Sequence, residues 1–189
     1  MNKEFWNDVA LKGAILGVVM LASHIFEQAM MLNGSPVQMA IVGGEMLAVC
    51  IIYISLLYRF TKRYSQQFST EEGFSFGKGF SYVLTLSLFT SIIVGLGGYI
   101  FTHFVIGYKE YTDGIVALYE NLLSSAQIPA QMVGTYEQML ERIAEQPEPS
   151  ILTTISSSIW SYIFGGGIVG LIIAGIVKRE PNVFGDEQN

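Results

Sequence analysis

Charge is scarce in this sequence of 189 residues, because Asp, Glu, Lys and Arg together make up only 14% of it. A soluble domain carries about 25% charged residues. The few charges are also unevenly spread, since they crowd between four long blocks that hold almost none. Just over half of the residues are apolar. This pattern argues against a soluble domain and predicts a membrane protein.

Cysteine and catalytic signatures are equally scarce. The single cysteine, Cys50, excludes an intramolecular disulfide and a cysteine-based metal site, and we interpret it as a small apolar residue. The sequence has no Gly-rich phosphate loop, no His-Glu-x-x-His and no Gly-x-Ser-x-Gly. Its basic residues do not cluster as nucleic-acid binding requires. We therefore expect no enzyme, no cofactor or metal site and no nucleic-acid partner.

Four apolar blocks are long enough to cross a bilayer, whose core of about 30 Å needs roughly 20 residues of helix. They cover residues 9–32, 37–58, 79–106 and 150–177. The last two contain no Asp, Glu, Lys or Arg. The first could be confused with a secretory signal, but Glu4 and Asp8 dilute its basic end and Glu27 stands where a small-residue cleavage site belongs. We expect all four to be transmembrane helices.

Basic residues predict the orientation of these helices, since Lys and Arg gather on the cytoplasmic side. With the N-terminus inside, eight of the ten basic residues lie on the inner side, and only Lys109 and Arg142 lie outside. Four helices then return the C-terminus to the cytoplasm. The predicted fold is all-α: a four-transmembrane-helix bundle, N-in and C-in, forming one integral membrane domain over residues 1–189.

A long acidic segment separates the third and fourth blocks. Residues 109–148 hold seven acidic residues against two basic ones. Their apolar residues recur with helical spacing and predict an extracytoplasmic insertion of two helices, the first capped by Thr112 or Asp113 and the second starting at Thr135. We expect the insertion to cap the bundle or to contact a partner, because an acidic face suits anionic lipid poorly.

Small residues recur four apart on every predicted span and predict close helix packing. These stripes comprise Gly13 and Gly17, then Gly44 and Ala48, then Ser87, Ser91 and Gly95, and finally Gly166, Gly170 and Ala174.

Ionisable residues inside the spans are the sharper signal, because each is costly in lipid unless it is paired or hydrated. His24 and Glu45 lie ten and eleven residues from the expected turn at Gly34, which predicts a similar depth. Glu27 shares the helix face of His24. We therefore predict a polar cluster of His24, Glu27 and Glu45. Further polar groups that could join it are Thr153, Thr154, Ser156, Ser157, Ser158 and His103.

The cluster has three possible interpretations. It could hold the helices in register through hydrogen bonds, or carry protons or cations along a transport path. A metal is the third reading, although the paired Glu-x-x-His motifs of di-metal bundles are absent.

Short motifs along the chain are similar to a known family. They are Asn2-Lys3-Glu4-Phe5-Trp6, Phe74-Ser75-Phe76-Gly77-Lys78-Gly79-Phe80 and Ile176-Val177-Lys178-Arg179-Glu180-Pro181. With the outer insertion, their order resembles the bacterial membrane-protein family called domain of unknown function 4199. The resemblance implies a multi-pass protein of the bacterial cytoplasmic (inner) membrane and supplies no active site.

Two functions follow as expectations. The first is a non-enzymatic structural, accessory or regulatory membrane component that meets the lipid bilayer and contacts a second copy or a membrane-protein partner through its outer acidic helices. The second is a small oligomeric transporter or channel subunit that uses the His24, Glu27 and Glu45 cluster.

Overall fold

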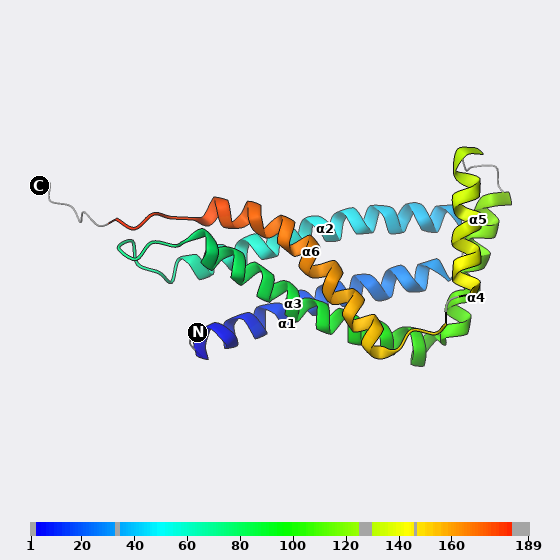
Figure 1. The fold of residues 1–189 in the computed structure, drawn as a ribbon, viewed down its shortest axis with the longest axis horizontal. Helices are drawn as coiled ribbons and strands as arrows, with labels where there is room; N and C mark the ends of the chain where they lie inside the picture. Colours follow the sequence, from blue (N-terminus) through cyan, green and yellow to red (C-terminus); the bar gives the residue numbers. More distant parts are fainter. Residues whose placement is uncertain (1–2, 33–34, 125–129, 146, 183–189) are drawn as a thin grey trace, which may run out of the picture.

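The computed structural model describes residues 3–32, 35–124, 130–145 and 147–182. Within these ranges the chain forms six α-helices and one π-helical segment, η1 (Figure 1). In chain order they are α1 (Lys3–Met31), α2 (Pro36–Ser65), α3 (Phe76–Ile100), η1 (Phe101–Ile106), α4 (Tyr108–Ser124), α5 (Ala130–Glu145) and α6 (Ile151–Val177). By length and composition, α1, α2, α3 with η1, and α6 could each cross a membrane. The predicted all-helical class with four membrane-length helices is confirmed.

The long helices α1, α2, α3 and α6 run along one direction, and α4 and α5 cross one end of them (Figure 1). Helix α3 is central, because its most extensive contacts are with α6 and α1. Helix α2 has thinner contacts with α1, α6 and α3. The starts of α1 and α3 and the ends of α2 and α6 lie at the end opposite α4 and α5.

Small residues bring α1 and α6 close to α3. A Cβ atom at Gly13 would lie 2.5 Å from Cβ of Phe89 on α3, so only glycine fits there. On the other side of α3, a Cβ atom at Gly166 of α6 would collide with Ser87. Three of the predicted stripes are therefore packing surfaces. The fourth, on α2, is not: Gly44 has no described atom within 4 Å of its would-be Cβ, and Ala48 is exposed.

Serines begin three of the long helices. Ser35, Ser75 and Ser150 each accept a hydrogen bond from the backbone N–H three residues later, and Ser35 completes a capping box with Gln38. The turn predicted at Asn33 and Gly34 lies outside the described residues.

The insertion helices begin earlier than predicted. Helix α3 continues without a break into η1, which ends at Ile106. Gly107 follows with φ 96°, and α4 starts at the next residue. Thr112 and Asp113 therefore lie inside α4 and do not cap it. Helix α5 starts at Ala130, five residues before Thr135. The prediction used capping residues as start signals, but the glycine that lets the chain turn decides where α4 begins.

Helix α4 covers the open end of the α1–α2 pair. Leu118 of α4 is buried and lines one small gap together with Met30 and Met31 of α1 and Met39 and Val42 of α2. Gly114 lies against Leu32 at the end of α1. Helix α5 in turn packs on α4, where the rings of Tyr119 and Tyr136 lie 5.5 Å apart.

At the opposite end, a bridge ties the chain that leaves α6 to the loop between α2 and α3. Phe74 and Arg179 exchange two backbone hydrogen bonds of 2.8 and 2.9 Å. The Arg179 guanidinium also donates to the backbone oxygens of Ser65 and Phe68. These contacts fix the loop that follows α2.

Candidate functional site: a polar network between the long helices

The predicted cluster is centred on a serine that joins α1 to α2. Ser23 of α1 is buried, and its hydroxyl donates to Oε1 of Glu45 on α2 across 2.6 Å. The two residues lie 22 positions apart in the sequence. Because α1 and α2 are antiparallel neighbours and Ser23 contacts Glu45, the adjacent His24 lies at about the level of Glu45.

Glu27 approaches the same serine from one turn further along α1. Its Oε1 lies 3.5 Å from the Ser23 hydroxyl, and its carboxyl group also reaches that of Glu45. A hydroxyl has one proton to donate, and the 2.6 Å contact with Glu45 is the shorter by far. The Oε2 atom of Glu45 is buried and has no hydrogen-bond partner among the described residues. Two carboxyl groups thus meet over a single donor.

His24 lies between these carboxyl groups and α3. Its Nδ1 lies 3.9 Å from Oε2 of Glu27, and its Nε2 lies 3.2 Å from the side-chain nitrogen of Gln28. The Gln28 oxygen accepts a 3.1 Å hydrogen bond from the Thr102 hydroxyl in η1. The His24 ring packs where Gly98 of α3 leaves space, since a Cβ there would lie 2.9 Å from the ring.

Helix α4 reaches the same network through Tyr111, whose phenol interacts with Gln28. Burial raises the pKa of this phenol above its ordinary value, so it is neutral near pH 7. We call Ser23, His24, Glu27, Gln28, Glu45 and Thr102 the helix network. The helix network joins α1, α2 and η1, and Tyr111 extends it to α4.

Several residues that could have joined the cluster lie elsewhere. Nε2 of His103 is 3.4 Å from Oε1 of Glu148, and its Nδ1 is 2.9 Å from the backbone oxygen of Tyr99. Ser158 donates to the backbone oxygen of Ser91 on α3. The remaining α6 candidates are exposed or half-buried: Thr153, Thr154, Ser156 and Ser157. These α6 hydroxyls do not reach the network because α6 packs on another side of α3, whereas the network lies where α1 meets α2 and the end of α3 with η1.

Sequence reasoning missed Ser23, Gln28 and Thr102, which supply the donors and acceptors of the network. Uncharged polar residues are common in membrane helices and cost little, so none of them stands out as Glu45 does. One signal was available: Ser23 precedes Glu27 by four residues and therefore shares its helix face.

The side chains of the network can form hydrogen bonds and exchange protons. Its ionisable groups are two carboxyl groups and one imidazole. Across the described residues no group of three His, Cys, Asp or Glu side chains is placed to hold a metal ion.

The four helices that are long and apolar enough to cross a membrane suggest a helical, multi-pass membrane protein. The chain belongs to the family described as "Protein of unknown function (DUF4199)", whose model matches residues 12–179. This match bears out the resemblance seen in the short motifs. Neither the curated proteins nor the solved structures contain a match to the chain.

Proposed function

We propose that this chain is a non-enzymatic structural or accessory component of the bacterial cytoplasmic membrane, in which the helix network locks α1, α2 and α3 together. The single observation that carries this proposal is the 2.6 Å hydrogen bond from Ser23 to Glu45. Together with the Gln28–Thr102 hydrogen bond, it means that the polar groups of the spans bind one another across helices. In lipid, where the hydrophobic effect does not hold helices together, hydrogen bonds of this kind act together with close side-chain packing.

The network works as a lock only if it carries little charge. An ionised carboxylate buried in hydrocarbon is costly, whereas a protonated one can both donate and accept. A single proton shared by the carboxyl groups of Glu27 and Glu45 gives the Oε2 atom of Glu45 a hydrogen bond to Glu27, while Oε1 accepts from Ser23. All three side chains are then satisfied with a single negative charge between them.

Two substitutions of Glu45 test the lock. In Glu45→Gln the amide oxygen still accepts from Ser23, and the NH₂ group takes the place of the proposed proton. We expect this variant to unfold in detergent at nearly the wild-type temperature. Glu45→Leu removes the acceptor of the short hydrogen bond from Ser23 and the carboxyl group beside Glu27, and it should lower the unfolding temperature clearly. Equal destabilisation by both variants would contradict the proposal.

One observation favours a second function, a small oligomeric transporter or channel subunit. Glu45, whose Oε2 atom is buried, and the half-buried Glu27 form a carboxyl pair beside His24, and such a pair can take up and release a proton or a small cation. In liposomes with a trapped pH-sensitive dye, this function predicts a proton flux that Glu45→Gln abolishes without unfolding the protein. The structural proposal predicts no flux above that of empty liposomes.

The orientation and the partner are parts of the same proposal. Basic residues gather at the end of the molecule opposite α4 and α5 and support a cytoplasmic location for it: Arg59, Lys62 and Arg63 in the last turns of α2, Lys78 at the start of α3, and Lys178 and Arg179 after α6. Helix α5 lies on the other side, and Glu137, Glu141 and Arg142 are among its many exposed residues. The exposure of this helix, whose charged residues are mostly acidic, supports contact with a second copy or with another membrane protein. Light scattering of the purified chain, with and without residues 130–145, tests self-association. An oligomer that becomes a monomer when these residues are deleted supports it, and a monomer in both cases contradicts it.

A further inference from the structure

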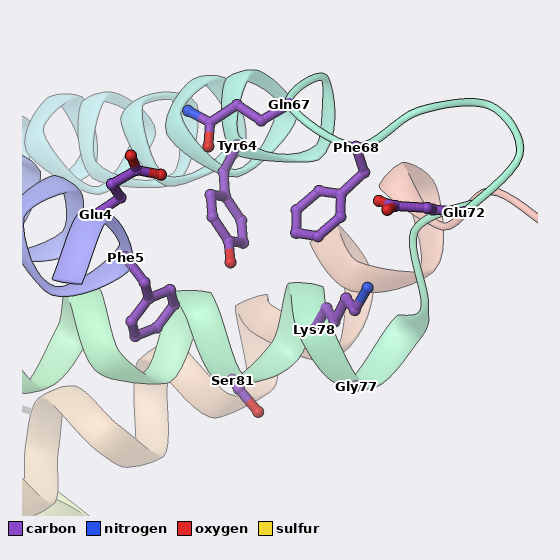
Figure 2. Close-up of a pocket in the computed structure, with 9 residues that line it drawn as sticks. All are labelled: Glu4, Phe5, Tyr64, Gln67, Phe68, Glu72, Gly77, Lys78 and Ser81. Carbon is purple, nitrogen blue, oxygen red and sulfur yellow. The ribbon is translucent and has the colours of Figure 1, made fainter. Parts of the chain in front are cut away.

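A cavity of about 630 Å³ opens at the end of the molecule opposite α4 and α5. It lies between the start of α1, the end of α2 and the start of α3, as Figure 2 shows. Nothing in the helix network reaches it. Its volume is typical of a site for a small molecule or for one headgroup of a lipid.

One wall of the cavity is aromatic. In Figure 2 the rings of Phe5, Tyr64 and Phe68 face the space above the start of α3. The Tyr64 ring lies 5.8 Å from that of Phe5 and 5.3 Å from that of Phe68. Behind this wall, Tyr64 stacks on the buried ring of Tyr82 at 4.2 Å. Because the rings support one another, the wall is already formed without a ligand.

Charged side chains of both signs line the same cavity. Lys78, in the first turn of α3, places its ammonium 4.3 Å from the centre of the Phe68 ring. Glu72, in the loop before α3, and Glu4, in the first turn of α1, contribute carboxyl groups. A ligand that matches this lining carries an anionic group and a cationic group a few bonds apart.

The position of the cavity further restricts the class of ligand that fits it. It lies at the ends of three membrane-length helices, at the level where their apolar segments give way to the charged loop. Phospholipid headgroups lie at this level of a bilayer. An exposed Trp6 and an exposed Phe76 next to the cavity match the aromatic residues that membrane proteins place there.

We propose that this cavity binds the headgroup of an amine-bearing glycerophospholipid such as phosphatidylethanolamine. Lys78 binds the phosphate, and Glu72 binds the ammonium group, which also lies against the aromatic wall. Glu4 adds negative potential on the same side. A headgroup with a phosphate but no amine, such as phosphatidylglycerol, lacks the group that the carboxylates attract. This inference rests on the four helices crossing a bilayer, but it does not depend on the role of Glu45.

The test uses the full chain in detergent, with bound lipid counted by native mass spectrometry. The wild type is expected to retain phosphatidylethanolamine several-fold better than phosphatidylglycerol. Lys78→Gln should weaken this retention about ten-fold, as loss of a charge-assisted hydrogen bond does, and Lys78→Arg should restore it. Glu72→Gln should remove the preference between the two lipids.

Matched controls come from the same end of the molecule. Lys178 and Glu180 form an exposed ion pair of 3.3 Å outside the cavity, so Lys178→Gln and Glu180→Gln change the same charges without touching the site. Equal retention of both lipids by the wild type would overturn the proposal. So would losses in the control variants as large as those in Lys78→Gln and Glu72→Gln.

A soluble headgroup tests the source of the ligand. Glycerophosphoethanolamine carries the same phosphate and ammonium but no acyl chains. We expect it to displace the lipid only at concentrations many-fold higher than that of the lipid itself. Displacement at equal concentration would assign the cavity to a water-soluble phosphate ester and overturn the lipid assignment.

Discussion

Ser23 of α1 donates its hydroxyl proton to Oε1 of Glu45 on α2 across 2.6 Å. This contact matters because α2 is the least buried of the four membrane-length helices. Its predicted small-residue stripe at Gly44 and Ala48 faces away from the other described helices, so close backbone packing does not hold it there. We infer that side-chain contacts such as this hydrogen bond carry much of the attachment of α2 at this level.

Ser23→Ala should weaken the attachment of α2 to α1. The substitution removes the hydroxyl that donates to Oε1 of Glu45 and leaves this half-buried carboxyl group less satisfied. Interhelical hydrogen bonds in membranes contribute about 0.6 kcal/mol on average and at most about 1.7 kcal/mol. We expect a loss toward the upper value, measured as a lower unfolding temperature in detergent. Ser156→Ala, at an exposed position on α6, is the control and should change nothing; equal losses in both variants would contradict the account.

Adjacent glycines on α6 provide a sharper test of the α3–α6 interface. A Cβ at Gly166 would collide with Ser87, lying 2.7 Å from its Cβ, whereas a Cβ at Gly165 would meet no described atom within 4 Å. Overpacking a tight contact costs about 1–3 kcal/mol. Gly166→Ala should therefore lower the unfolding temperature of the purified protein. Gly165→Ala should leave it unchanged, and identical behaviour of the two variants would mean that α6 packs on α3 through another face.

The loop that carries Glu72 depends on Gly73. This residue has φ 63°, and a Cβ there would lie 2.7 Å from the backbone nitrogen of Pro181. Gly73→Ala therefore combines an unfavourable backbone conformation with a clash against the chain that leaves α6. We expect faster proteolysis of the loop between α2 and α3 in Gly73→Ala. Gly77→Ala, where the added Cβ meets no described atom within 4 Å, should be cut at the wild-type rate. A Gly73→Ala variant as resistant as the wild type would contradict the bridge between Phe74 and Arg179.

Much of the fold could be predicted from the sequence, because membrane helices need long apolar runs and such runs are visible in one dimension. The ends of the helices were harder. Helix α2 continues to Ser65, past the charged Arg59 at which its apolar block stops, since a helix can continue beyond the hydrocarbon core. The π-helical end of α3 and the bridge between Phe74 and Arg179 depend on tertiary contacts that leave no periodic pattern.

The candidate site was predictable in its charged members only. The depth argument placed His24 and Glu45 together because an antiparallel hairpin makes equal distances from the turn equal depths. It could not identify Thr102 as a member, since that depends on how α3 packs against α1. The same argument admitted the α6 hydroxyls as possible members of the cluster. They lie elsewhere because α3 packs between α1 and α6, an arrangement that the sequence does not reveal.

The proposed topology has four membrane crossings with both chain ends in the cytoplasm. Labelling single cysteines from the outer side of the membrane tests it most directly. Cys50 is replaced by Ser, and single cysteines are placed at two exposed positions, Gln66 after α2 and Gln138 on α5. In spheroplasts, a maleimide that cannot cross the membrane should label Gln138→Cys at once. It should label Gln66→Cys only after lysis. Immediate labelling of Gln66→Cys, or the same labelling of both sites, would contradict the proposed topology.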